Sequence, residues 1–379
     1  MTHITPQEKT GPQRAISAAR SNCGLSLVEL MVAITIGLII LAAVVRLFAT
    51  SRATYTLEEG LARVQESGRF AMEFMAQDIR MAGYAGCSAN LSGSQVGNIV
   101  APPASATTFN PDGIAGYKHT CSGSCSGTLT EWDPDVPSEY FPSGSIMPLT
   151  GTDVLVIQRA DTLSAHLTGQ EGKDKDKDKD NDDAKIQIID TTALAGQLAA
   201  GDVLMVSDCQ SADIFKATAV SSGSDKTTIS HSNSSNTSSK LTHSYDNSAQ
   251  LMKLVTRVYF IGRRGNSASN PPALYRKELG NDGSFIAQEL VEGVEVLRFS
   301  YGEDTDNDRV ANIYRDPSSV SSWRKVLSVR TGLLVGTTGN VEQALDTRIY
   351  DLAGNTAGPY NDKKRRRAFN SAIRLRNHY

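Results

Sequence analysis

The stretch GLSLVELMVAITIGLIILAAVVRLF, residues 24–48, decides the fold of this chain. From Leu25 to Val45 every residue is apolar, small or hydroxylated, with the exception of Glu29. A helix rises about 1.5 Å per residue, so the run is long enough to cross the roughly 30 Å hydrocarbon core of a bilayer. A lone carboxylate in such a run costs about 2–3 kcal/mol or more unless it finds a partner, so the presence of Glu29 needs an explanation.

Three interpretations of this run compete. A cleaved secretory signal would have a shorter apolar stretch followed by a small-x-small cleavage site, which is not found here. A plain membrane anchor fits the length but gives no reason for Glu29. The third interpretation places the processing site before the run. Residues 1–24 carry Lys9, Arg14 and Arg20 and end in Gly24, which suits a cytoplasmic leader under the positive-inside rule.

The helix is expected to continue well past the apolar run. No proline occurs between Arg14 and Ala101, and Gly83 and Gly86 are plausible breakers. After the run the pattern becomes amphipathic, and its apolar members at helical spacing are Leu57, Leu61, Val64, Phe70, Ala71, Phe74, Met75 and Ile79. We therefore predict one helix over residues 25–84, whose first half lies in a membrane or fibre and whose second half packs on a globular domain.

A β-rich domain is expected over residues 85–379. Ser, Gly, Thr and Asn become frequent after Cys87, and β-type runs follow at 152–159, 185–190, 202–208, 213–220, 250–263, 294–302, 325–336 and 367–377. Alternation in the 325–336 run favours antiparallel sheets with one solvated face. The charged repeat at 171–183 predicts a mobile surface loop, and the polar stretch 221–240 a surface hairpin or loop. The fold class is thus α+β.

Cysteine usage points to an exported domain. Cys87, Cys121, Cys125 and Cys209 follow the apolar run, and after export they can form two disulfides in any of three pairings. Four free thiols in a cytosolic domain are the alternative. A zinc site is disfavoured, because only one short-spaced cysteine pair exists and no histidine pair stands near it. The six histidines are also not expected to cluster with acids or cysteines, which argues against catalysis.

The stretch GLSLVELMVAITIG, residues 24–37, resembles the type III signal of type IV prepilins and pseudopilins. The resemblance implies that a dedicated prepilin peptidase cuts after Gly24 and methylates the new amino group of Leu25. Most members of the family begin the mature chain with Phe or Met, and Leu25 departs from that pattern. Glu29 then matches the family's assembly glutamate, which pairs with the N-terminal ammonium of a neighbouring subunit and so offsets the cost of a buried carboxylate.

Further blocks resemble the PilW family of minor type IV pilins. They are residues 58–87, 201–215, 273–279, 290–314, 322–335 and the tail 365–379. The resemblance implies a pilin-like fold and a low-abundance subunit that primes pilus assembly near the fibre tip, supporting motility and adhesion. Expected partners are the major pilin, other minor pilins and a PilY-type tip adhesin. The chain would first be anchored in the inner membrane with a periplasmic domain, and then enter the pilus at the cell surface.

Two other functions fit the same sequence. The minor pseudopilin at the tip of a type II secretion pseudopilus would share every N-terminal feature. A membrane-anchored adhesin or sensor would remain uncut and outside any fibre.

A calcium loop is one interpretation of the acidic stretch at 304–316. Asp304, Asp306 and Asp308 have the alternating spacing of calcium ligands, and Asn312 stands where a further ligand is expected. Arg309 occupies the position where such loops have glycine. The other interpretation is an acidic turn between strands that holds no ion.

Neither catalysis nor nucleic-acid binding is expected. The chain has a net charge of −3, and the basic cluster KKRRR at 363–367 has no interleaved aromatic residues, so we interpret it as a solvated strand edge or a contact for a partner subunit. No nucleophile-elbow, phosphate-loop or H-E-x-x-H motif occurs. The expected mechanism is assembly rather than turnover.

Overall fold

The structure, a computed structural model, describes residues 26–87, 95–102, 104, 106–168, 184–189 and 193–378. The expected leader 1–24, Leu25 and the expected mobile loop 171–183 lie outside the described residues. The chain divides into two compact units, with the boundary between Tyr55 and Thr56.

Helix α1 spans Leu27–Met81, close to the predicted helix, and is the α-helix of the described part of the chain. Hydroxyl groups within its first half donate to carbonyls one turn back, as Thr35 Oγ1 does to the oxygen of Val32 at 2.8 Å. Such bonds keep a hydroxyl satisfied in an apolar setting. The helix ends at Met81 rather than Tyr84, just before Gly83, whose positive φ of 72° takes the backbone out of helical geometry.

The largest sheet has nine strands among the described residues. Its main path runs β1-β7-β6-β10-β4-β2-β3, with β11 paired to β10 and β12 paired to β11. The strands are β1 Val96–Asn98, β2 Ile114–His119, β3 Trp132–Asp133, β4 Val154–His166, β6 Val203–Ser207, β7 Ala212–Lys216, β10 Gln250–Arg263, β11 Pro272–Leu279 and β12 Phe285–Glu292. Strand β10 organises this sheet, because it pairs along one side with β4 and along the other first with β6 and then with β11.

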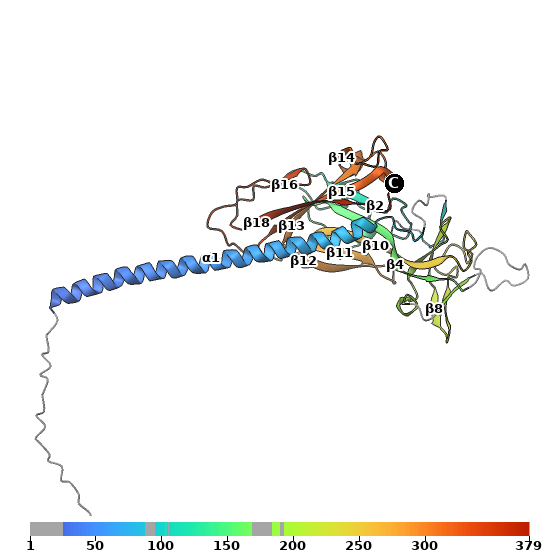
Figure 1. The fold of residues 1–379 in the computed structure, drawn as a ribbon, viewed down its shortest axis with the longest axis horizontal. Helices are drawn as coiled ribbons and strands as arrows, with labels where there is room; N and C mark the ends of the chain where they lie inside the picture. The colour runs from blue at the N-terminus through green and yellow to red at the C-terminus, as the bar shows by residue number, and fades with distance from the viewer. Residues whose placement is uncertain are drawn as a thin grey trace, which may run out of the picture. The chain divides into compact units, whose positions relative to one another are not determined.

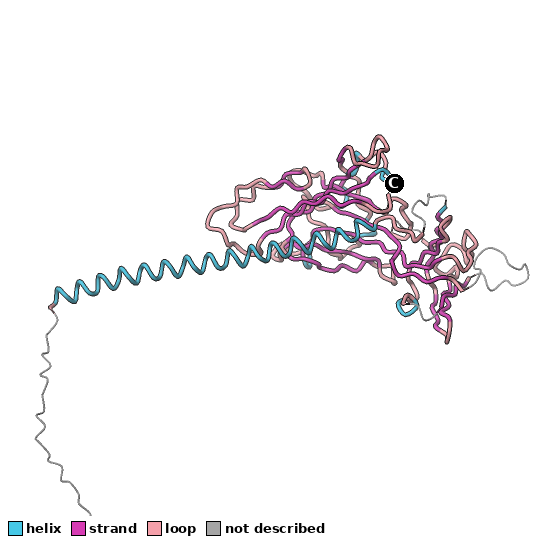
Figure 2. Tube along the Cα trace, in the orientation of Figure 1, coloured by secondary structure: helices cyan, strands magenta, loops and turns pink. Residues whose placement is uncertain are grey.

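Three smaller sheets complete the described domain. A four-stranded sheet has the order β14-β13-β15-β18, and a two-stranded and a three-stranded sheet have the orders β16-β17 and β5-β9-β8. Their strands are β5 Lys185–Ile189, β8 Ala219–Ser222, β9 Lys226–Ser230, β13 Val294–Glu303, β14 Ile313–Arg315, β15 Val326–Gly336, β16 Tyr350–Leu352, β17 Asn355–Ala357 and β18 Arg366–Arg374. Figure 2 shows how strands and loops dominate the chain after α1. The antiparallel prediction is confirmed for the described pairs except β1–β7, which is parallel.

The second half of α1, within residues 56–81, shares a core with both large sheets (Figure 1). Val64, Ala71, Met75 and Ile79 are at most 2% exposed there. The core members from the sheets include Leu155, Ile157, Tyr259, Ile261, Leu297, Phe299, Val329 and Leu333. The expected amphipathic packing of this half of the helix is therefore confirmed.

Several details of the helix face differ from the prediction. Phe70 and Phe74 are 43% and 40% exposed, whereas Asp78 is 2% exposed. The buried stripe is therefore narrower than the sequence indicates. At Gly68 the helix meets the ring of Phe369 in β18. A Cβ at Gly68 would lie 2.3 Å from that ring, so only glycine lets the helix and β18 approach this closely.

Sequence patterns identified the long strands and missed the short or atypical ones. Strand β11 begins with Pro272, which is tolerated at the first position of a strand but lowers the strand signal. Strand β12 contains Gln, Glu and Leu, which are good helix formers, and lies at a sheet edge. In β15 the face with Leu327, Val329, Thr331 and Leu333, which alternation predicts to be apolar, is buried. Leu334 on the other face is buried as well, because the β16–β17 hairpin covers it.

Candidate functional site

The first half of α1 presents apolar side chains around its whole circumference. Its most apolar window has a mean hydropathy of 2.7 and is 0% buried, so by length and composition α1 is able to span a membrane. Glu29 lies exposed in the first turn. A surface of this kind is stable only against lipid or against other apolar helices. The predicted cleavage and methylation site, Gly24 and Leu25, lies outside the described residues.

A buried carboxylate attaches the second half of α1 to the large sheet. Asp78 accepts hydrogen bonds from Arg257 Nη1 at 2.7 and 3.0 Å and from the Tyr259 hydroxyl at 2.5 Å. Arg159 Nε lies 3.6 Å from the same carboxylate. Burial, and then the charge of Asp78, raises the pKa of Tyr259. The sequence reasoning missed Asp78, because its partners lie far away in the chain.

Two disulfides join the four cysteines that follow the helix. Cys87 pairs with Cys209 across a sequence separation of 122, and Cys121 pairs with Cys125 across a separation of 4. The first bridge ties the segment after α1 to the β6–β7 turn. In the chain-entropy account it stabilises the fold by about 4–5 kcal/mol, whereas the short bridge contributes about 2 kcal/mol.

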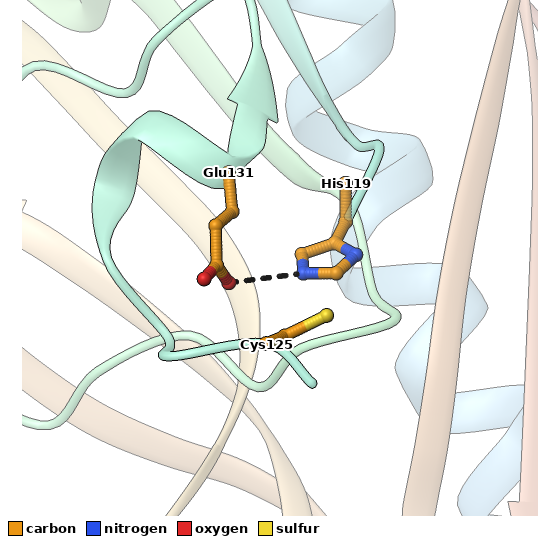
Figure 3. A group of neighbouring side chains, drawn as sticks. All are labelled: His119, Cys125 and Glu131. Carbon is orange, nitrogen blue, oxygen red and sulfur yellow. Dashed lines mark ion pairs between the residues drawn. The ribbon is translucent and has the colours of Figure 1, made fainter. Parts of the chain in front are cut away.

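A histidine does cluster with an acid and a cysteine, so the sequence-based expectation was wrong. His119, Cys125 and Glu131 each offer a ligand atom, and these atoms lie within 4.8 Å of one another (Figure 3). The signal was present as H-x-C-x₃-C-x₅-E over residues 119–131. It was missed because one histidine rather than two accompanies the short-spaced cysteines.

The acidic turn after β13 brings three of the four predicted calcium ligands together. Oxygens of Asp304, Asp306 and Asp308 lie within 4.8 Å of one another. Asn312 does not join them as a ligand, because its amide nitrogen donates to Asp306 at 3.2 Å and its oxygen accepts from the backbone of residue 305. Arg309 adopts a positive φ of 68°, the conformation that the missing glycine would favour.

The carboxylate of Asp304 already has backbone partners. It accepts from the N–H groups of Asp306, Asn307 and Arg309 at 3.2, 2.7 and 2.9 Å. Burial acts to raise the pKa of Asp304, but the bonds from Arg309 and Asn307 outweigh it and leave that pKa below its usual value. The calcium loop and the acidic turn that holds no ion thus stay the two interpretations of this stretch.

The basic cluster at 363–367 is largely neutralised within the chain. Arg366 is 4% exposed. Its guanidinium contacts Glu295 at 2.5 Å, Asp346 at 3.2 Å and Asp362 at 2.6 Å. The interpretation of the cluster as a solvated edge or partner contact is therefore wrong for Arg366, whose charge holds β18 against its neighbours.

Lys277 in β11 is fully buried without a carboxylate partner in the described structure. Its Nζ donates to the backbone oxygen of Tyr140 at 2.9 Å and to Ser145 Oγ at 3.0 Å. The same atom lies 4.1 Å from the ring centroid of Phe141. Burial lowers the pKa of Lys277 to about 8. The lysine ties the 140–145 segment to the sheet, a role that no pattern in the sequence indicates.

Two family models match separate parts of this chain, one near each end. A family model described as "Type IV Pilus-assembly protein W" matches residues 258–377. A second model, the "Prokaryotic N-terminal methylation motif", matches residues 19–45. The resembling blocks at 58–87 and 201–215 lie outside both matches. No match is found among curated proteins or among solved structures.

These matches agree with the fold. The methylation motif ends inside the exposed apolar half of α1, and the other match covers β10 from Val258 onward and most of the four-stranded sheet. The combination of an N-terminal apolar helix, its methylation motif and a β-rich domain is typical of a membrane-anchored pilin that is later assembled into a pilus. The two family-model matches together thus support a PilW-type minor type IV pilin.

Proposed function

We propose that this pilin primes pilus assembly and resides at or near the fibre tip, in a complex with other minor pilins and in contact with the major pilin. The observation that carries the proposal is the exposed apolar half of α1 with a single carboxylate in its first turn. In this role the chain is structural rather than enzymatic, and it supports motility and adhesion through the fibre that it helps to start.

Glu29 supplies the driving force for ordered assembly in this proposal. After the prepilin peptidase cuts behind Gly24, the methylated amino group of Leu25 carries a positive charge. A carboxylate that is unpaired in lipid costs about 2.5–3.5 kcal/mol, and a neighbour's N-terminal ammonium within the fibre removes that cost. The pairing favours assembly over the free membrane state, and it also selects one register between neighbouring helices.

The size of the globular unit supports a position at the end of the fibre. Residues 56–379 form one compact unit. In a helical fibre every interior subunit has neighbours on both sides, and a large domain meets fewer of them at the end. The tip position also leaves surface available for a PilY-type adhesin.

The internal neutralisation of Arg366 is in line with protein partners rather than nucleic acid. A phosphate backbone is bound by arginine and lysine side chains that are free to release counterions. The guanidinium of Arg366 is instead buried among three carboxylates.

Mass spectrometry of N-terminal peptides in sheared fibres and in membranes tests the proposal. The expected result is a methylated peptide beginning at Leu25 in the fibres. Glu29→Ala should be cleaved normally and yet be lost from the fibres by at least about tenfold, whereas Glu58→Ala, at an exposed helix acid outside the apolar run, should be incorporated normally.

Two results would contradict the proposal. Normal incorporation of Glu29→Ala would refute the pairing mechanism. Recovery of the wild-type chain only from membranes, with residues 1–24 still attached, would favour the uncut membrane-anchored adhesin or sensor.

A tip pseudopilin of type II secretion remains the alternative, since the methylation motif at 19–45 belongs equally to pseudopilins. Deletion of the gene separates the two functions. Loss of surface fibres with normal protein secretion supports the pilus role, and the converse supports the secretion role.

A further inference from the structure

A compact set of metal-ligand side chains surrounds the small disulfide loop. His119 ends strand β2, Cys121 and Cys125 lie in the following loop, and Glu131 ends the short 3-10 helix Leu129–Glu131. Figure 3 shows His119, Cys125 and Glu131 pointing toward one another. Cys121 is bonded to Cys125, so its sulfur lies directly beside this cluster. The four side chains form no part of the assembly function proposed above.

The imidazole of His119 is buried and lacks a hydrogen-bond partner at one nitrogen. The residue is 6% exposed, and its Nε2 has no hydrogen-bond partner. The closest acid oxygen, Glu131 Oε2, is 3.6 Å away, which is longer than a hydrogen bond. Buried histidine nitrogens normally have a hydrogen-bond partner, and this one instead faces the cluster.

Glu131 is held in place as a ligand would be. Its Oε1 accepts from the backbone N–H and the hydroxyl of Ser126, both at 2.6 Å, and its Oε2 accepts from the N–H of Gly127 at 3.0 Å. Such outer-shell hydrogen bonds orient metal ligands and maintain their charge.

The distances fit tetrahedral coordination. Nitrogen and oxygen ligands at about 2.0–2.1 Å from a zinc ion lie roughly 3.4 Å apart, close to the 3.6 Å between His119 Nε2 and Glu131 Oε2. The Cα atoms of Cys121 and Cys125 are 6.0 Å apart. Once the bond between the two sulfurs is reduced, a small movement of the side chains therefore lets both sulfurs reach one ion. Cysteine, histidine and carboxylate together are a donor set that zinc accepts.

We propose that the dithiol form of this chain binds one zinc ion through Cys121, Cys125, His119 and Glu131. Two thiolates and a carboxylate around a divalent cation leave one net negative charge. Arg298 contributes a nearby positive charge to the surroundings of His119, and it is itself paired with Asp153 at 2.7 Å.

The disulfide seen in the structure and the zinc-binding dithiol are alternative forms of one site. In the zinc form both thiolates are already deprotonated. Oxidation joins the two sulfurs by one bond, breaks two sulfur–zinc bonds, releases the zinc ion and passes two electrons to an acceptor. A small disulfide such as oxidised glutathione takes these electrons together with two protons from solvent and becomes two thiols. Zinc thus occupies the site before oxidation and leaves as the disulfide closes.

The test uses the full chain in detergent micelles, reduced with a phosphine that is then removed without oxygen. Cobalt is titrated as the probe, followed by competition of zinc against a chromophoric chelator. The matched variants are His119→Gln, Glu131→Gln and the double variant Cys121→Ser/Cys125→Ser, which retains Cys23, Cys87 and Cys209 and so measures background binding. His166→Gln, at an exposed histidine of β4, is the control.

The expected result for wild type is one cobalt ion with thiolate charge-transfer bands and the intense visible bands of a tetrahedral site. Each ligand variant should weaken zinc binding by more than about tenfold, the double serine variant should lose the bands, and His166→Gln should match wild type. Oxidised glutathione should release the zinc as the disulfide forms.

The cobalt spectrum of wild type tests the proposal even if a ligand variant fails to fold. An octahedral spectrum, or one without thiolate bands, would overturn it. Zinc binding of wild-type strength in His119→Gln or in the double serine variant would overturn it as well, because the ion would then be held elsewhere. None of these outcomes bears on fibre incorporation, which tests the assembly role separately.

Discussion

Replacement of the buried Lys277 by methionine should change how the stability of the domain depends on pH. Lys277 is 0% exposed and has oxygens of Tyr140 and Ser145 as its hydrogen-bond partners. Methionine has a similar length and carries no charge, so Lys277→Met removes the titrating group while largely keeping the volume.

The size of the effect follows from the pKa of the lysine. Burial lowers it from 10.5 to about 8, which corresponds to about 3 kcal/mol at about 1.36 kcal/mol per pH unit. Between these two values the unfolded chain binds a proton that the folded chain lacks, so the free energy of unfolding of wild type rises with pH. Below pH 8 the full cost of the buried charge is present. The stability of Lys277→Met relative to wild type should therefore fall by about 3 kcal/mol from pH 7 to pH 10.5.

Urea unfolding of the full chain in micelles, followed by circular dichroism with the disulfides intact, measures this difference. Both proteins are measured at each pH. Tyrosines and other groups titrate equally in the two proteins, so their contributions cancel in the difference between the two free energies of unfolding. Lys185→Met, at an exposed lysine of β5, controls for the loss of one positive charge. A difference between Lys277→Met and wild type that stays constant within about 1 kcal/mol over this range would refute the reasoning.

Three further predictions concern the packing of α1 and the acidic turn. Gly68→Ala should lower the Tm, because a Cβ 2.3 Å from the ring of Phe369 costs about 1–3 kcal/mol and outweighs a helix gain of about 1 kcal/mol. Phe369→Leu should relieve the loss, and an unchanged Tm in the single variant would contradict the contact. Asp78→Ala should cost about 2–4 kcal/mol in urea unfolding, because Arg257 keeps only Glu278 and the buried Tyr259 hydroxyl loses its acceptor, and a loss below 1 kcal/mol would show that these bonds matter little. Chelation of calcium should leave the Tm unchanged, since Asp304 accepts three backbone N–H groups. A calcium-dependent rise in Tm that Asp304→Asn abolishes would instead support the calcium loop.

Local sequence patterns were sufficient for the parts of the fold that depend on near neighbours. The apolar run with Glu29 predicted the membrane-compatible half of α1, and the spacing of Val64, Ala71 and Met75 predicted its packed half. Periodicity over many residues is a strong signal, because every turn of a helix repeats it. The same reason explains why the long strands β10 and β15 were predicted and the strands with weak or mixed signals were not.

From the sequence alone an α+β fold could be predicted, with an apolar helix that carries one acid, an amphipathic continuation and a β-rich domain with cysteines. The burial of polar groups and the identity of their distant partners became clear only from the folded arrangement. Asp78 meets Arg257, and Arg366 meets Glu295. The physical reason is that periodicity reports which face of an element is apolar, whereas the partner of a buried charge depends on where distant segments meet. No local pattern encodes that meeting.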